Sequence, residues 1–423
     1  MIVGIYGISS QSGLTYLADF LDHGYEVVGY AHSSEHGKKV VSSINEAGGV
    51  WLERPKNTNN ENTHFVGLGS SVVTLDITPL LRADIIVVAL PSIYHVDVAS
   101  VLSSIGISDK NIPLVLSPSR SFASPYLWQV LGNGYPIICL STCPYSCKIK
   151  TPNRAYLKRR KRTYIASFEG NLQKHQEGIF KQLFQHAAVT RIPALTTLNN
   201  IGAVFHCATY IMNYEEIKRR ELIGKPFSFY IEGIAERDDV GHVIEQIDQV
   251  RLQIAAKLGL SVFGLKDNPR EDIWRKLTNA LRALEEESSD DIEMLRRIRR
   301  EFSEYLNNCV VSAAHWLDLT YGVIRIDGEH LSQTISRTPT YQNNSVPQQR
   351  YVEEDIPTGL VVYEAIAKRL NIDCRSISKI IDTYNCNKGC NMREIGRNLS
   401  CFTNDYIYRY LQGKYIDNND KVK

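Results

Sequence analysis

The first 36 residues predict a strand–turn–helix–strand unit, and this unit limits what the rest of the chain can fold into. An apolar run at 2–6 is followed by a turn of small residues at 7–13, and apolar residues then recur at helical spacing until Gly24. A second apolar run at 26–30 completes the unit. A length of about 30 residues is typical of the first βαβ unit of a dinucleotide-binding sheet. We therefore expect the chain to begin with an α/β domain.

The turn of this unit indicates a site for a diphosphate. Free N–H groups and the helix dipole favour anions at a helix N-terminus, and only small residues let a phosphate approach the backbone closely. Gly7, Ser9 and Ser10 are the candidate cofactor contacts here. Ser9 stands where the second glycine of the G-x-G-x-x-G pattern is expected, so a plain strand–helix turn that binds no nucleotide is the alternative.

The segment after the second strand bears on the choice of cofactor. An acidic residue at the end of this strand would bind the ribose 2′-hydroxyl of NAD, whereas basic residues would accept the 2′-phosphate of NADP. No Asp or Glu closes the strand, and the loop is basic, which favours NADP with NAD as a second option; an ordinary solvated loop is the alternative. The candidate residues are Tyr30, His32, Ser33, His36, Lys38 and Lys39.

Further apolar runs at 83–91, 113–119 and 136–142 predict more parallel strands. Ligands bind at the carboxyl edge of such sheets, so the residues that end these strands are candidate cofactor contacts. They are Leu90, Pro91, Ser117 and Pro118. Residues 155–168 are expected to extend the sheet by antiparallel pairing. The basic run at 158–162 lies within this segment, and we interpret it as a solvated strand or hairpin.

From about residue 190 the pattern becomes helical. Apolar residues recur at helical spacing over 199–216, 243–258, 273–284, 292–317 and 359–370. A polar connection at 338–355 is of the kind that often serves as a lid or binding loop. We therefore expect a Rossmann-type dinucleotide-binding domain over 1–188 and a mostly α-helical catalytic domain over 189–423.

Composition excludes several classes of protein. Of 423 residues, 43% are hydrophobic and 22% charged, and the net charge of +2 gives no general attraction to nucleic acid or to a membrane surface. No apolar run approaches the roughly 20 residues that span a bilayer, and no signal peptide is expected. The nine cysteines are odd in number and form no CxxC pair, which favours a reducing, cytoplasmic location and no metal site.

Five segments, in order, resemble those of one family. They are the glycine turn with Val28-Gly29-Tyr30-Ala31, then Leu116-Ser117-Pro118, Leu140-Ser141-Thr142, Asn199-Asn200 with Val204-Phe205-His206, and Arg350-Tyr351-Val352-Glu353-Glu354-Asp355-Ile356-Pro357. Together they resemble the opine metallophore dehydrogenases, the staphylopine, pseudopaline and yersinopine synthases. These form a branch of the octopine/nopaline-type opine dehydrogenases.

The resemblance implies a reductive condensation. A nicotianamine-like amine, built from histidine and an aminobutyrate unit, would condense with a 2-oxo acid such as pyruvate or 2-oxoglutarate. NADPH would then reduce the resulting imine. The opine product would chelate transition metals, so metal is implied for the product and not for the active site. Relatives are commonly homodimers, and we expect one here.

The resemblance also implies site residues. His206 matches the family's catalytic histidine, which suits a proton donor working near neutral pH. Cys207 follows it where the family has proline. The matched substrate contacts are Thr142, Ser146, Asn199, Asn200 and Asp355. Ser146 falls on the position that selects the 2-oxo acid, and a small neutral residue there would admit either pyruvate or 2-oxoglutarate. Tyr30 and His36 stand where relatives have basic side chains, so Lys38 or Lys39 is expected to hold the 2′-phosphate.

Two other functions are compatible with the same sequence. A related dehydrogenase could act on a simple amino acid or a hydroxy acid. A dinucleotide sensor without turnover is favoured by Ser9 in the turn and by Cys207 after the histidine.

Overall fold

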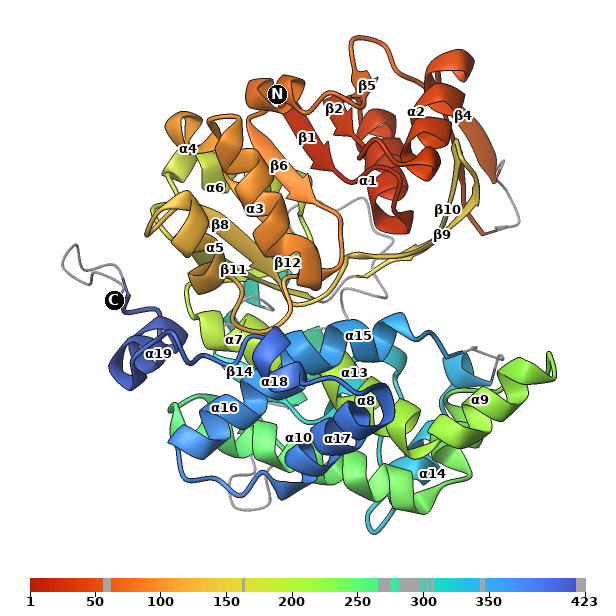
Figure 1. Ribbon diagram of the computed structural model, residues 1–423, viewed down its shortest axis with the longest axis vertical. Helices are drawn as coiled ribbons and strands as arrows, with labels where there is room; N and C mark the ends of the chain where they lie inside the picture. The colour runs from red at the N-terminus through yellow and green to blue at the C-terminus, as the bar shows by residue number, and fades with distance from the viewer. Residues whose placement is uncertain are drawn as a thin grey trace. The chain divides into compact units, whose positions relative to one another are not determined.

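A computed structural model (Figure 1) describes residues 1–55, 62–161, 164–264, 275–280, 297–298, 300–301, 304–305, 308–342 and 347–415. The chain divides into two compact units. The first comprises Met1–Ser119 and Ala123–Arg191, and the second comprises Arg120–Phe122 and Ile192–Lys423. Residue 188, where the sequence suggested a boundary, lies within strand β12 (Ala187–Thr190) of the first unit.

The first unit is built on an eight-stranded sheet. Its strand order is β12-β11-β8-β7-β6-β1-β2-β5. The strands are β1 (Ile2–Tyr6), β2 (Glu26–Tyr30), β5 (Val72–Thr74), β6 (Ile85–Val88), β7 (Leu114–Leu116), β8 (Ile137–Leu140), β11 (Tyr164–Glu169) and β12. The neighbouring strands β8, β7, β6, β1, β2 and β5 are parallel to one another, whereas β11 runs antiparallel to β8. The central strands are buried on both faces, which explains their uninterrupted apolar sequences.

A second, four-stranded sheet belongs to the same unit, with order β4-β3-β10-β9. Its strands are β3 (Gly49–Glu53), β4 (Thr63–Gly67), β9 (Tyr145–Thr151) and β10 (Arg154–Arg160). Residues 155–168 therefore do not extend the main sheet as one piece. Only β11 pairs there, while β10 pairs with β9 and β3. The basic run begins in β10, where Lys158 and Arg159 are exposed on one strand of a hairpin.

Helix α1 (Gln11–Asp22) packs against strands of both sheets. Residues 13–21 are all buried, so no face of this helix over that stretch is left to solvent. Figure 1 shows the remaining helices of the unit packed around the main sheet. They are η1 (Thr78–Arg82), η2 (Ser92–Tyr94), α2 (Glu35–Ala47), α3 (His95–Ser104), α4 (Ile107–Lys110), α5 (Ser124–Leu131) and α6 (Lys174–Leu183).

The second unit is mostly helical in its described part. Its helices are α7 (Pro193–Leu198), α8 (Ile201–Met212), α9 (Tyr214–Leu222), η3 (Ile231–Ala235), α10 (Asp238–Lys257), α13 (Ala313–Tyr321), α14 (Leu331–Ser336), η4 (Pro339–Tyr341), α15 (Arg350–Asp355), η5 (Ile356–Leu360), α16 (Val361–Arg369), α17 (Arg375–Lys388), α18 (Met392–Ile395) and α19 (Asn404–Leu411). The expected fold class, a Rossmann-type domain followed by a helical domain, is confirmed. Within the described ranges, no helix is both long and apolar enough to cross a membrane.

The helical pattern was only partly right in detail. Strand β14 (Cys309–Val311) interrupts the run at 292–317 and pairs in parallel with β13 (Ser261–Phe263). Helix α15 occupies the end of the segment at 338–355 that was expected to be a loop. Of the helix expected over 273–284, residues 275–280 are described and are helical, and the rest lies outside the described residues.

A fully buried arginine joins several elements of the second unit. Arg251 on α10 pairs with Asp248 and donates hydrogen bonds to the carbonyl oxygens of Leu198 and Val311. Asp248 in turn accepts a hydrogen bond from the amide of Ala313 at 2.7 Å. Burying a charge is tolerated only when such partners satisfy it. The pair therefore fixes α7, α10, β14 and α13 as one framework.

Candidate active site

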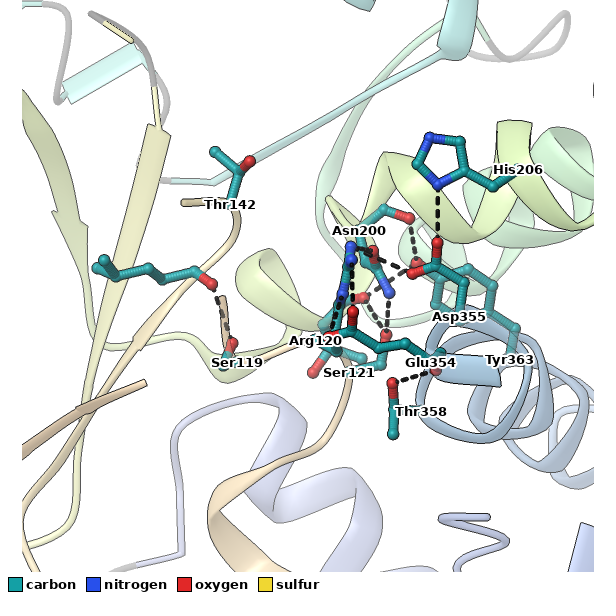
Figure 2. Close-up of polar contacts among 12 residues, drawn as sticks. Ser119, Arg120, Ser121, Thr142, Asn200, His206, Glu354, Asp355, Thr358 and Tyr363 are labelled. Carbon is teal, nitrogen blue, oxygen red and sulfur yellow. Dashed lines mark hydrogen bonds and ion pairs between the residues drawn. The ribbon is translucent and has the colours of Figure 1, made fainter. Parts of the chain in front are cut away.

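His206 lies in the middle of α8 and forms a pair with a buried carboxylate. Its Nδ1 is 2.8 Å from Oδ2 of Asp355, which is fully buried at the end of α15 (Figure 2). The His206 side chain is 18% exposed, so part of the ring meets solvent. Cys207 supplies a backbone N–H that a proline at this position would lack, and α8 runs unbroken through it.

The local sequence around Asp355 explains its orientation. Pro357 has no N–H to donate, and the helix there widens into the π-helix η5 instead of ending. Asp355 is the last residue before this widening. Gly202 on α8 makes room for the carboxylate, because a Cβ at 202 would lie 3.3 Å from Oδ2 of Asp355 and 2.9 Å from Nη1 of Arg120. The absence of a side chain at Gly202 thus leaves room for Asp355 to pair with His206.

Arg120 completes a charged cluster. Its Nε is 3.2 Å from Oε1 of Glu354, and its Nη1 is 3.2 Å from Oδ1 of Asp355 and donates to Oδ1 of Asn200 at 3.1 Å. Burial alone would lower the pKa of Arg120, but the carboxylates of Asp355 and Glu354 raise it well above its ordinary value. The guanidinium therefore stays charged. It faces two carboxyl groups, those of Glu354 and Asp355, beside the imidazole.

Aromatic side chains enclose the imidazole. The ring of Tyr351 stacks on His206 with centroids 4.2 Å apart and planes 16° from parallel. The hydroxyl oxygen of Tyr230 lies 3.4 Å from Nε2 of His206, and the Tyr230 ring stacks on Tyr341 at 3.9 Å. Burial raises the pKa of both Tyr230 and Tyr351, so their hydroxyls remain protonated. Nδ1 of His206 therefore has a close partner in Asp355, whereas Nε2 faces the Tyr230 hydroxyl at a longer distance.

The two predicted asparagines differ in their surroundings. Asn200 lies inside the cluster, where its amide also contacts the hydroxyl of Ser121 at 3.4 Å. Asn199 is turned toward β14, with its Nδ2 donating to the carbonyl oxygen of Cys309 at 3.2 Å. Asn200 is thus linked to the His206–Asp355 pair by its hydrogen bond with Arg120, whereas the side chain of Asn199 is hydrogen-bonded to strand β14.

Thr142 and Ser146 belong to the first unit, so the structure describes them apart from His206. The Thr142 hydroxyl accepts a hydrogen bond from Nζ of Lys161 at 2.7 Å. Ser146 lies in β9 opposite Arg159 and is half-buried.

The glycine turn of the first unit forms a close junction between β1 and α1. Gly7 has a φ of +98°, and a Cβ there would lie 2.8 Å from Cδ2 of Leu90. A Cβ at Gly13 would lie 2.0 Å from the carbonyl oxygen of Gly7, so Gly13 provides the close approach one position later than the usual pattern. Ser10 caps α1 by accepting from the amide of Gly13, and it donates to the carbonyl oxygen of Ala89 at 2.6 Å. The turn fits a diphosphate at a helix N-terminus.

The predicted 2′-phosphate segment lies beside this turn. Nε2 of His36 contacts the carbonyl oxygen of Ser9 at 3.0 Å, which links the two candidate loops. Lys38 and Lys39 are exposed in the first turns of α2, and His32 and Ser33 are exposed before it.

Other predicted cofactor contacts are less open to a ligand. The Tyr30 side chain is buried against Tyr6, with ring centroids 4.9 Å apart. The hydroxyl of Ser117, which precedes Pro118, is buried and lies 2.6 Å from the hydroxyl of Tyr16. Pro91 directly precedes η2.

Sequence reasoning missed Arg120, Glu354, Tyr230 and Tyr351 as members of the site. Glu354 and Tyr351 stood in the last of the five matched segments, next to Asp355 and on the same short helix. Arg120 follows a strand of the first unit, and no local pattern shows that residues 120–122 belong with the second. Tyr230 precedes a π-helix that has no sequence signature of its own.

Known proteins resemble this chain in sequence and in fold. Residues 194–386 match the family described as NAD/NADP octopine/nopaline dehydrogenase, alpha-helical domain. An opine dehydrogenase of Arthrobacter sp. (strain 1C) is 22% identical over 326 residues, which is 75% of this chain and 74% of that protein.

Two solved structures share the fold over nearly the whole chain. Octopine dehydrogenase in complex with NADH and agmatine covers 96% of this chain and 98% of its own, with a TM-score of 0.67 at 16% identity. NADP⁺-bound yersinopine dehydrogenase covers 98% of each chain, with a TM-score of 0.54 at 11% identity. The resemblance drawn from the five segments is confirmed. The chain is therefore similar to the octopine/nopaline-type opine dehydrogenases, in sequence over its helical domain and in fold over nearly its whole length.

Proposed function

We propose that this protein joins the amino group of an amine to a 2-oxo acid and reduces the resulting imine with NADPH, with NADH as a second option. The observation that carries the proposal is the His206–Asp355 pair, which lies within the part of the chain that matches the family's helical domain. The glycine turn and the N-terminus of α1 provide a fitting place for the dinucleotide diphosphate.

His206 is the proposed acid and base. A carboxylate can only accept hydrogen bonds, so Nδ1 carries the proton shared with Asp355 and Nε2 is the nitrogen that exchanges protons with substrate. Nε2 first removes a proton from the substrate ammonium group, which frees the amine to attack the 2-oxo carbon. The attacking nitrogen passes one proton to the new alkoxide, which gives a neutral carbinolamine, and Nε2 then returns the proton that it holds to the carbinolamine hydroxyl. The C–O bond breaks, the oxygen leaves as water, and the nitrogen lone pair forms the C=N bond.

Asp355 and Arg120 are proposed to support these proton transfers. The carboxylate of Asp355 holds the imidazole in one tautomer and stabilises the imidazolium that forms between the two steps. Arg120 stays charged and pairs with the buried carboxyl groups of Asp355 and Glu354, which holds them in place beside the imidazole. The bound cofactor supplies the hydride that adds to the imine carbon.

The substrates we propose are a nicotianamine-like amine and either pyruvate or 2-oxoglutarate. Ser146 is the proposed selector of the 2-oxo acid, since a small neutral side chain repels neither one carboxylate nor two. The opine product would chelate transition metals. We further infer a homodimer that works in the cytoplasm. The alternative is a dehydrogenase of the same family that acts on a simple amino acid or on a hydroxy acid.

The experiment combines purified protein with NADPH or NADH and a matrix of amines and 2-oxo acids. The amines are a histidine–aminobutyrate conjugate, arginine and simple amino acids; the acids are pyruvate and 2-oxoglutarate. We expect cofactor oxidation only when both partners are present, and a product with the mass of amine plus acid minus water plus two hydrogens. Oxidation with a 2-oxo acid alone would indicate a hydroxy-acid dehydrogenase, and no oxidation in any pairing would contradict the proposal.

A further inference from the structure

The hydroxyl of Tyr230 faces Nε2 of His206, the ring nitrogen that is not bonded to Asp355. The separation between Tyr230 Oη and His206 Nε2 is 3.4 Å, which is long for a hydrogen bond between these two atoms alone. At this spacing, however, a single oxygen atom of a ligand can lie about 2.8 Å from both groups and form a hydrogen bond with each. Both side chains are partly exposed.

The backbone holds Tyr230 in place relative to His206. Tyr230 immediately precedes η3, and η3 is fastened to α8, the helix that carries His206. Nδ2 of Asn213 donates to the carbonyl oxygens of both Thr209 and Gly233, at 2.8 and 3.0 Å. A Cβ at Gly233 would lie 2.9 Å from Cγ2 of Thr209, so the close approach of η3 to α8 requires glycine there. The spacing between the two side chains is therefore set by one rigid junction.

The Tyr230 ring is fixed as firmly as its backbone. Tyr341 stacks on it at 3.9 Å, and Phe229 meets it edge to face at 5.3 Å. Burial keeps the hydroxyl protonated, since it raises the pKa of Tyr230 well above the ordinary value for tyrosine. A fixed, neutral hydroxyl costs no reorganisation when charge develops beside it, and donors placed in advance in this way stabilise transition states most strongly.

We propose that Tyr230 is a second catalytic residue, whose hydroxyl and His206 Nε2 together bind the oxygen atom that the 2-oxo acid loses as water. This inference rests on the proposed condensation reaction. As the amine attacks, the carbonyl π electrons move onto that oxygen, and Tyr230 donates a hydrogen bond to it. One proton passes from the attacking nitrogen to this oxygen and gives a carbinolamine hydroxyl, to which His206 delivers the proton that it took from the substrate ammonium group. The C–O bond then breaks with its electron pair on oxygen, the nitrogen lone pair forms the C=N bond, and water leaves. Tyr230 keeps its own proton throughout.

The test compares two tyrosine-to-phenylalanine variants of the same unit. Tyr230→Phe keeps the stacked ring and removes only the hydroxyl. Tyr210→Phe is the matched control: Tyr210 lies one turn after His206 on α8, and its buried hydroxyl has no hydrogen-bond partner among the described residues. We expect Tyr230→Phe to lower kcat/KM for the 2-oxo acid by roughly 10–100-fold. Tyr210→Phe should match wild type, and both variants should keep the wild-type cofactor Kd and Tm.

A double-mutant cycle separates a shared oxygen from a packing role. If both donors act on one atom, Tyr230→Phe should cost no more than about threefold once His206 is alanine, measured as opine formed over long incubations. Wild-type kcat/KM in Tyr230→Phe, or an equal loss in both backgrounds, would overturn the inference while leaving the condensation intact. Failure of wild-type protein to make any opine would instead remove the proposed function itself.

Discussion

Asp355 is the residue on which the site depends most closely, because it touches both the imidazole of His206 and the guanidinium of Arg120. Its Oδ1 is buried and accepts no hydrogen bond among the described residues, so the nearby guanidinium charge is what offsets its desolvation. The five matched segments had placed Asp355 among the substrate contacts. The geometry leads us to propose that it acts through His206.

Replacing Asp355 with asparagine should separate charge from shape. Asp355→Asn keeps the size of the side chain but can no longer stabilise an imidazolium, so we expect kcat to fall by roughly 10²–10⁴-fold. Glu353→Gln, which neutralises an exposed carboxylate on the same helix, is the control and should keep wild-type kcat. Initial rates at saturating substrates measure both. An Asp355→Asn variant as active as the control would remove Asp355 from the mechanism.

At the scale of elements, the helix that follows Asp355 is anchored by a buried carboxylate. Glu364 on α16 accepts hydrogen bonds from Arg393 of α18 and Ser378 of α17, and it is 3% exposed. Burial by itself would raise the pKa of Glu364, but the hydrogen bonds from Arg393, Ser378 and Lys368 outweigh it and lower the pKa to about 2. The folded state is therefore stabilised wherever Glu364 is ionised.

This shift gives a pH-dependent prediction for Glu364→Gln. A carboxylate with a lowered pKa adds stability that is full above its unfolded pKa of about 4.5 and is lost as pH falls toward 2. The variant should be less stable than wild type by roughly 1–3 kcal/mol at pH 7, and the difference should shrink below about pH 5. Thermal unfolding across this pH range measures it, with Asp405→Asn on α19 as an exposed control. A difference that does not change with pH would contradict the assigned pKa.

Some elements could be predicted from sequence and others could not. Strands β1 and β2 and helix α1 follow from apolar runs and a small-residue turn, which are local signals. Strand β14 could not be found in this way, because its three residues lie in a run with helical spacing and pair with β13, far away in the chain. The helix expected to start at 359 begins earlier, since the π-helix η5 accommodates Pro357 without a break.

At the scale of the whole molecule, the cofactor segment and the proton-transfer cluster lie in different units. The least predictable feature is the segment Arg120–Phe122, which is flanked by the first unit and belongs to the second. Arg397 donates to the carbonyl oxygen of Ser121 at 2.7 Å, and Phe122 packs against Tyr410 with centroids 4.5 Å apart. Such contacts join residues almost 300 positions apart, beyond the reach of local periodicity.

The cofactor preference is a prediction about the first unit as a whole. Lys38→Ala combined with Lys39→Ala should weaken NADPH binding by roughly 10–100-fold and NADH binding far less, because only NADPH carries the 2′-phosphate. Lys110→Ala on α4, which removes an exposed lysine from the same unit, serves as control. Titrations with each reduced cofactor provide the Kd values. An equal effect on both cofactors would exclude these lysines from the phosphate site.

The measurement that bears most directly on the account is the rate of opine formation by His206→Ala, with cofactor Kd measured on the same preparation. The imidazole is assigned to proton transfer and not to cofactor binding, so we predict a loss in kcat of roughly 10²–10⁴-fold with the Kd for NADPH unchanged. If the variant turned over at the wild-type rate, or if it lost cofactor affinity while keeping turnover, the mechanism centred on His206 would be contradicted.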